Sequence, residues 1–232
     1  MKRTILFSIL LSVLLFVQQT TIAADNMASS FSDPFGFRAY SGYGRMLNKV
    51  DPELDQLEKT HAINWINGIV IGSDLVFYLN KAKSCGLGLK YQIMHSQGSS
   101  MMDIHSNMGR LEDRVNISYL GPVFSQRFTL NEGQNVLMYN IGMGWLFYDW
   151  RGEINKANGN MSGQTIGATL DINYSRMIKK KLAVGVDLSL TTGALSSYDT
   201  FDGVKRITVQ LEDNQKEGLT HMGLSLQLLY KF

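Results

Sequence analysis

The pattern that indicates the fold is clearest in the last ten residues of the chain, Gly223-Leu224-Ser225-Leu226-Gln227-Leu228-Leu229-Tyr230-Lys231-Phe232. Side chains of a β-strand point alternately to opposite faces, so every second residue shares a face. One face of this segment is apolar and ends in aromatic rings: Leu224, Leu226, Leu228, Tyr230 and Phe232. The other is mostly small or polar: Gly223, Ser225, Gln227, Leu229 and Lys231. This alternation predicts a strand between two unlike surroundings.

Seven earlier segments repeat the pattern, which gives eight expected strands. One is marked by Val115, Ile117 and Tyr119 and is expected to bend at Gly121-Pro122. In Phe35–Arg45 the facing is ambiguous, because Tyr40 and Tyr43 fall on opposite sides. The others are Ile69–Leu79, Leu87–Ile93, Leu137–Phe147, Ile166–Tyr174 and Leu182–Leu190.

The connections between these strands alternate in length. Short turns are expected at Asn80–Ser84, Asn131–Gln134 and Lys179–Lys181. Long loops are expected at Asn48–Trp65, Ser96–Leu111, Gly152–Ser162 and Ser197–Gly218, with a helix start at Asp51-Pro52-Glu53 in the first. Short turns on one side and long loops on the other are typical of a transmembrane β-barrel. The sequence therefore predicts an all-β fold, a closed eight-stranded antiparallel up-and-down barrel.

The first 24 of the 232 residues have the order of a secretory signal peptide. A basic start, Lys2-Arg3, precedes an apolar run over 5–17, and small residues end at Ala24. We expect cleavage there, which leaves residues 25–232 as one barrel domain with no net charge. Such a balance does not favour a nucleic-acid partner. The single cysteine excludes an internal disulfide, and the mature chain contains no apolar run long enough for a membrane helix.

Alternation alone does not tell which face is outside, since a soluble barrel with an apolar interior has the same period. If the apolar face meets lipid, the polar residues of the other face must pair inside, because an unpaired buried charge is costly. We expect Asp74, Lys90, Asp171 and Asp187 to form such an interior charge network. Aromatic residues near the strand ends favour the membrane barrel, since interfacial rings form two belts. These rings are Phe77, Tyr78, Phe128, Tyr174, Tyr230 and Phe232 at one level, and Trp65, Phe147, Tyr148 and Trp150 at the other.

Here the chain resembles the small eight-stranded outer-membrane barrels of bacteria, similar to the OmpA barrel and to OmpX-like proteins. The resemblance implies that Leu224, Leu226, Leu228, Tyr230 and Phe232 form the signal that the barrel assembly machinery recognises. The segment from Asn116 to Pro122, followed by Arg127, also resembles outer-membrane barrel domains common in the Bacteroidota. This resemblance is specific for architecture and location and weak for activity.

No residues favour catalysis. His95-Ser96 and His105-Ser106 are adjacent pairs, so on a strand each pair would point to opposite faces. His61 and His221 stand alone, and Asp171 with Asp187 is better explained as part of the ion-pair set than as an acid/base pair. No spacing indicates a metal site or a cofactor.

The sequence therefore predicts a non-enzymatic outer-membrane protein of a Gram-negative bacterium. Its long extracellular loops would support the envelope or contact an unknown partner. Its other expected partners are the outer-membrane lipids and the assembly machinery. Two alternatives stay open: a narrow pore for small solutes, and a soluble periplasmic barrel that binds an apolar ligand.

Overall fold

The computed structural model describes residues 34–47, 62–63, 65–79, 84–104, 107–154, 157–201, 205–212 and 216–231. Side chains of 100–110, 132, 154–158 and 201 are not included in that description. Four sequence predictions lie outside the described residues: the signal peptide, the helix start at Asp51-Pro52-Glu53, the residues His61 and His105-Ser106, and the position of Phe232. Among the described residues, no helix is long and apolar enough to cross a membrane.

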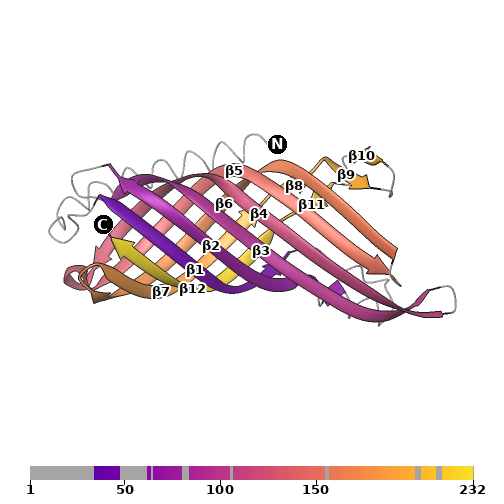
Figure 1. Cartoon of the computed structure of the whole chain (residues 1–232). Coiled ribbons are helices and arrows are strands. Elements are labelled where there is room, and N and C mark those ends of the chain that lie inside the picture. Colours follow the sequence, from indigo (N-terminus) through magenta and orange to yellow (C-terminus); the bar gives the residue numbers. More distant parts are fainter. Residues whose placement is uncertain are drawn as a thin grey trace, which may run out of the picture.

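Eight of the described strands close into an antiparallel barrel (Figure 1). Each strand pairs with the next in sequence from β1 to β7, and the last strand closes the ring by pairing with both β7 and β1. The eight are β1 (Phe35–Met46), β2 (Asn67–Tyr78), β3 (Cys85–Ile104), β4 (Asn107–Leu130), β5 (Asn135–Ile154), β6 (Ala157–Lys179), β7 (Leu182–Thr192) and β12 (His221–Lys231). The predicted fold class is confirmed.

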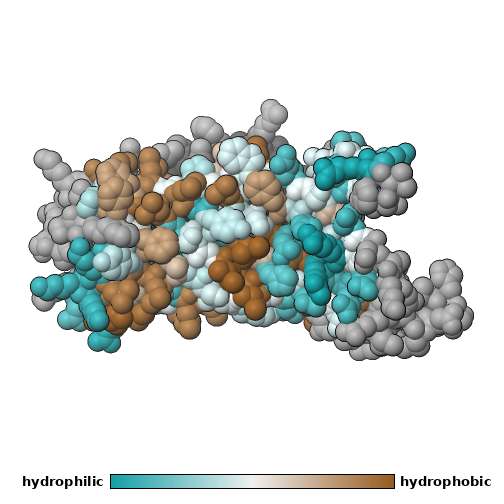
Figure 2. All heavy atoms as spheres, viewed as in Figure 1, coloured by the Kyte–Doolittle hydropathy of each residue, from teal (hydrophilic) through white to brown (hydrophobic). Residues whose placement is uncertain are grey.

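The apolar face of the strands points outward, as predicted for a membrane barrel. Leu226 is 74% exposed and Val186 47% exposed, whereas their neighbours Ser225 and Asp187 are buried. Figure 2 shows apolar side chains gathered over the barrel wall and hydrophilic ones over the end where the strands extend. A closed ladder satisfies the backbone hydrogen bonds and leaves no open sheet edge, which is the requirement for strands in lipid.

Three of the four expected loops were wrong in part, because the strands continue into them. β3 and β4 pair without a register shift from Ser96↔Val115 to Ile104↔Asn107, and β5 and β6 pair up to Ile154↔Ala157. The last connection contains β8 (Ala194–Leu195), β9 (Ser197–Phe201), β10 (Arg206–Gln210) and β11 (Glu217–Gly218). Beyond the apolar wall the outward residues become polar, so the alternation that marked the strands ends while the backbone pairing continues. We call this the extension end of the barrel.

The opposite end carries the short connections, and we call it the turn end. The β4–β5 turn is the 3-10 segment η2 (Asn131–Gly133), where Asn131 has φ 50° and Gly133 has φ 91°. Asparagine and glycine are the residues that adopt this left-handed backbone at low cost, which explains why the chain reverses here. β6 and β7 are joined by Lys180-Lys181. Gly121 and Pro122 pair with β3, whereas the β4–β5 ladder omits both residues and continues in the same register on either side of them.

The aromatic belts are confirmed in part: at the second level only Phe147, which is 41% exposed, points outward, and the agreement is better at the turn end. There the outward rings include Phe35, Phe37, Phe77, Tyr174 and Tyr230, each about two-fifths exposed. Tyr78 and Tyr148 are buried in the lumen, and Trp65 and Trp150 pack against the interior. The parity of a strand explains the error: of two adjacent rings, such as Phe77 and Tyr78 or Phe147 and Tyr148, one must face inward.

We expect Leu226→Arg to destabilise the lipid-inserted barrel by about 2–4 kcal/mol, because it puts a charge near the middle of the apolar wall. Gln97→Arg, on the outward face of the extension end, is the matched control and should change stability by less than about 0.5 kcal/mol. Urea unfolding in lipid vesicles measures both. Equal destabilisation by the two arginines would contradict the outward position of the apolar face.

Candidate functional site: the charged lumen

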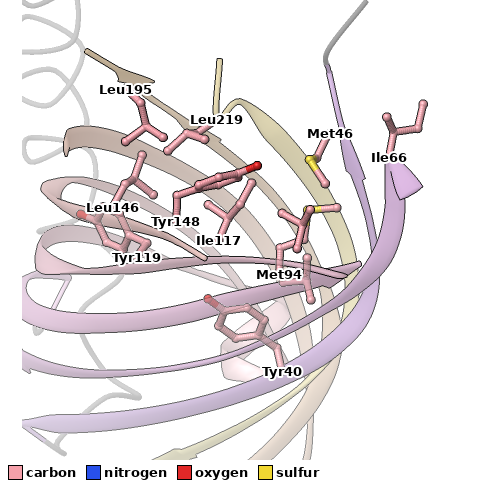
Figure 3. Close-up of a cluster of buried hydrophobic side chains, with 12 residues drawn as sticks. Tyr40, Met46, Ile66, Met94, Ile117, Tyr119, Leu146, Tyr148, Leu195 and Leu219 are labelled. Carbon is pink, nitrogen blue, oxygen red and sulfur yellow. The ribbon is translucent and has the colours of Figure 1, made fainter. Parts of the chain in front are cut away.

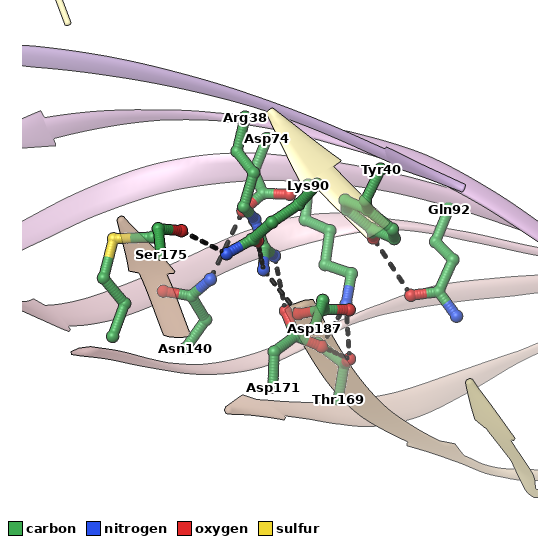
Figure 4. A network of polar contacts seen from close by, with 12 residues as sticks. Arg38, Tyr40, Asp74, Lys90, Gln92, Asn140, Thr169, Asp171, Ser175 and Asp187 are labelled. Carbon is green, nitrogen blue, oxygen red and sulfur yellow. Dashed lines mark hydrogen bonds and ion pairs between the residues drawn. The ribbon is translucent and has the colours of Figure 1, made fainter. Parts of the chain in front are cut away.

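The four residues predicted for the lumen lie together around a fifth, Arg38 of β1 (Figure 4). The Arg38 guanidinium contacts Asp74 at 2.7 Å, Asp171 at 2.9 Å and Asp187 at 2.6 Å. Lys90 Nζ lies 2.5 Å from the second oxygen of Asp171 and donates to Thr169 Oγ1 at 3.0 Å. All five ionisable side chains are at most 2% exposed.

These contacts cross the barrel and do not merely run along its wall. Asp74 belongs to β2, next to β1, but Asp171 and Asp187 belong to β6 and β7 on another part of the ring. Although Lys90 is directly opposite Asp74 in the β2–β3 ladder, its ammonium group reaches Asp171 of β6. Three of the four ion pairs therefore join strands that share no backbone hydrogen bonds, and the fourth, Arg38–Asp74, joins the paired strands β1 and β2.

Neutral hydrogen bonds surround the ion pairs. Gln227 Oε1 accepts from Arg38 at 3.3 Å while Gln227 Nε2 donates to Ser175 Oγ at 2.6 Å. Asn140 Nδ2 donates to Asp74 at 3.3 Å. Burying ions is costly unless their remaining hydrogen-bonding positions are filled, and these amides fill two of them, one on Arg38 and one on Asp74.

Arg38 was missed because the facing of its strand was ambiguous. Its residues Gly36, Arg38, Tyr40 and Gly44 are inward, whereas Tyr43 is outward and 53% exposed. The signal that could have found Arg38 is the set of glycines that share its face, Gly36, Gly42 and Gly44, which matches the glycine-rich inner face of the other strands. The tyrosines obscured this signal.

Tyr40 lies between the charged lumen and the extension end. Its ring centroid is 4.7 Å from the Arg38 guanidinium and 5.7 Å from Lys90 Nζ. A Cβ atom at Gly72 would collide with this ring, so a residue without a side chain is needed on the neighbouring strand.

A chain of polar contacts continues from Tyr40 to His221. The Tyr40 hydroxyl donates to Gln92 at 3.1 Å. Gln92 Nε2 in turn lies 3.1 Å from Nε2 of His221, whose Nδ1 is 3.0 Å from the Leu219 carbonyl oxygen.

Between Tyr40 and the extension end, apolar side chains fill the lumen, which the sequence did not predict. We call this cluster the apolar plug (Figure 3). It contains wall residues such as Met94 and Ile117, together with Leu195 and Leu219 from the β7–β12 connection. Its buried members are Tyr40, Met46, Ile66, Val70, Met94, Val115, Ile117, Tyr119, Leu146, Tyr148, Leu195 and Leu219.

A third layer fills the lumen towards the turn end. The Arg127 guanidinium stacks over the Tyr78 ring at 3.8 Å, and Tyr78 donates to Met138 Sδ at 3.4 Å. Val136, Met138, Ala183 and Leu229 form a small buried cluster in the same region. Ion pairs thus lie between two layers of packed side chains.

The histidines that the structure describes show no catalytic arrangement. His95 faces outward, where its Nδ1 lies 2.7 Å from Asn116 Oδ1, and Ser96 faces the lumen and donates to backbone carbonyls of Trp65 and Asn67. The prediction that this adjacent pair points to opposite faces is confirmed. No group of three His, Cys, Asp or Glu side chains with the arrangement of a metal site occurs in the described part of the chain.

Of the three comparisons with known proteins, the one with solved structures gives matches, and these concern the fold. No protein-family profile matches the chain, and no curated protein matches it. A major outer membrane protein from Thermus thermophilus has a TM-score of 0.54 and 10% identity, over 85% of this chain and 99% of that one. Neisserial surface protein A has a TM-score of 0.45 and 10% identity, over 86% of this chain and 97% of that one. The outer membrane protease OmpT from Escherichia coli has a TM-score of 0.42 and 13% identity, over 72% of this chain and 64% of that one.

The chain therefore has an eight-stranded antiparallel barrel fold, and it shares a barrel fold with the outer membrane protein of Thermus thermophilus. At 10% identity this likeness describes architecture alone, because one barrel fold carries many functions.

We expect Asp171→Leu to lower the free energy of unfolding by about 3–5 kcal/mol, because it leaves Lys90 without a carboxylate and Arg38 with one fewer. Asp149→Leu is the matched control. Its partner Arg151 is exposed, and exposed pairs contribute about 0–1 kcal/mol. Thermal unfolding in detergent compares the two variants. A loss no larger for Asp171→Leu than for Asp149→Leu would show that the buried ion pairs do not hold the lumen together.

Proposed function

We propose that this protein is an integral, non-enzymatic barrel of the outer membrane of a Gram-negative bacterium, exported by a cleaved signal peptide over residues 1–24. The observation that carries the proposal is the combination of an apolar outer wall with a lumen filled by ion pairs and packed side chains. The wall suits lipid, and the filled lumen suits a scaffold better than a channel.

The unequal ends of the barrel support one orientation. In outer-membrane barrels short turns face the periplasm and longer connections face the exterior. By that rule the turn end, with η2 and Lys180-Lys181, is periplasmic, and the extension end is extracellular.

The extension end is the part that we propose contacts something outside the cell. Its outward side chains line a depression of about 460 Å³ between β4, β5, β6, β9 and β10. Arginines and carboxylates lie there in separate cross-strand rows: Arg114 is directly opposite Arg151, and Glu112 is directly opposite Glu153. Charge of both signs in one depression favours a partner with polar or charged groups. Contact with such a partner is what envelope support or surface attachment would need.

Two other functions are less well supported. A narrow pore needs a water path, but Arg38 and Lys90 bind carboxylates across the lumen and the apolar plug follows. A soluble barrel that binds an apolar ligand needs its apolar face inside, yet Leu224, Leu226 and Leu228 are all more than half exposed.

We expect the purified protein to give no discrete conductance steps in a planar lipid bilayer, because ions cannot pass the filled lumen without displacing buried ion pairs. A porin inserted in the same bilayer serves as the positive control. A gel in which unheated and heated samples migrate differently verifies that the protein added was a folded barrel. Regular conductance steps from such a folded sample would favour the pore.

We also propose that the last strand is the assembly signal, with Leu224, Leu226, Leu228, Tyr230 and Phe232 read by the barrel assembly machinery. The exposure of the first four along one outward face supports this, because a recognition partner can reach them before the barrel closes.

Deletion of Phe232 is expected to leave little barrel in the outer membrane of cells, while the purified variant still refolds in detergent. Phe77→Ala removes another outward ring of the turn end and is the control that should assemble normally. Normal membrane levels after deletion of Phe232 would argue against a terminal signal, and failed refolding in detergent would indicate a role in stability instead.

A further inference from the structure

Four exposed basic side chains lie together in sequence at the turn end. Arg176, Lys179, Lys180 and Lys181 are all exposed, at the end of β6 and in the turn that follows it. No acidic residue occurs between Ile172 and Val186, and the adjoining β4–β5 turn contains a single one, Glu132. We call Arg176 and the three lysines the basic turn.

The basic turn is held in place from both sides. A register shift between Met177 and Lys179 in the β6–β7 ladder marks a local bulge, which tightens the chain before it reverses. The Met177 amide donates to the Gln134 carbonyl oxygen at 2.8 Å. On the other side the Lys231 amide donates to the Lys181 carbonyl oxygen at 3.0 Å. The position of the lysine backbone is therefore fixed by the β4–β5 turn and by the end of β12.

A depression of about 310 Å³ lies at this junction. The exposed Lys179 and Lys180 form its basic part, and Met177 and Ile178 form its apolar part. Lys231 also borders it, but its side chain is buried. An occupant that suits both parts carries negative charge on one side and hydrocarbon on the other.

The basic turn lies where the apolar wall ends. Along the outward face of β6, Tyr174 is 44% exposed, Arg176 follows two residues later, and Ile178 is 54% exposed. Tyr230 and Phe35 are exposed at the same end of the barrel. Aromatic rings of membrane proteins lie at the level of the lipid headgroups. This places the cations of the basic turn at that level too.

We infer that the basic turn binds the headgroups of anionic phospholipids in the leaflet at the turn end, which by the proposed orientation is the periplasmic one. This inference rests on the proposed membrane location. Lysine ammonium groups donate charge-assisted hydrogen bonds to phosphodiester oxygens. Zwitterionic lipid offers the same oxygens but no net negative charge, so basic side chains at a membrane surface discriminate between the two. A soluble acidic protein would match the lysines but not the adjoining apolar wall.

The test uses the full-length barrel purified in a non-ionic detergent and offered equal amounts of phosphatidylglycerol and phosphatidylethanolamine. Native mass spectrometry counts the lipids that stay bound. The wild-type protein should retain phosphatidylglycerol in preference, and K179Q/K180Q/K181Q should retain about tenfold less of it. K179R/K180R/K181R keeps the charge and should behave as wild type.

The matched control is R114Q/R151Q/R206Q, which removes three exposed cations from the extension end. It should not change phosphatidylglycerol retention. Equal retention by wild type and K179Q/K180Q/K181Q would overturn the inference, and so would equal loss in the two glutamine variants.

Two further measurements keep the result interpretable. Raising the ionic strength should release phosphatidylglycerol from the wild-type protein without any substitution, since salt screens exposed charges. Persistent retention at high salt would count against a charged headgroup site. Heat-dependent gel migration reports separately whether the protein is a folded membrane barrel, so a failure of the proposed function is distinguishable from a failure of lipid binding.

Discussion

A closed strand ladder with its apolar side chains turned outward forces the polar side chains of the same strands into a narrow lumen. In β12 the outward leucines alternate with Ser225, Gln227 and Lys231, which are buried. Since each strand has only two faces, the wall and the lumen are determined together. Arg38 and its three carboxylate partners are one consequence of this constraint, because charges that cannot reach water must neutralise one another.

The contents of the lumen then limit what the protein can do. Arg38 joins β1 to β2, β6 and β7, while Lys90 joins β3 to β6, so the barrel is braced across its interior as well as around its wall. Towards the extension end, the β7–β12 connection contributes Leu195 and Leu219 to the apolar plug. A barrel filled in this way offers its two ends for interaction. The described parts of the two ends differ: charge of both signs lies at the extension end, and the basic turn lies at the turn end.

Prediction from the sequence was accurate where apolar and polar residues alternate, and it failed where they do not. The alternation located all eight barrel strands and the outward position of Leu226 and Val186. The predicted strands were too short on β3 to β6. Outside the apolar wall the outward residues face water and are polar, so apolar and polar residues no longer alternate although the backbone pairing continues. Adjacent aromatic residues misled for a related reason, since Tyr78 and Tyr148 follow rings that already occupy the outward position.

The sequence by itself determined the architecture, since a period of two, a closing aromatic strand and the absence of an apolar run of helical length leave few other folds. It also identified Asp74, Lys90, Asp171 and Asp187 as residues of the inner face. Only the tertiary structure decided that they meet at Arg38, and that Lys90 binds Asp171 rather than the Asp74 opposite it in the ladder. The physical reason is that strand periodicity assigns a side chain to a face, whereas a contact across the lumen depends on barrel closure and on the register of every strand between the two partners.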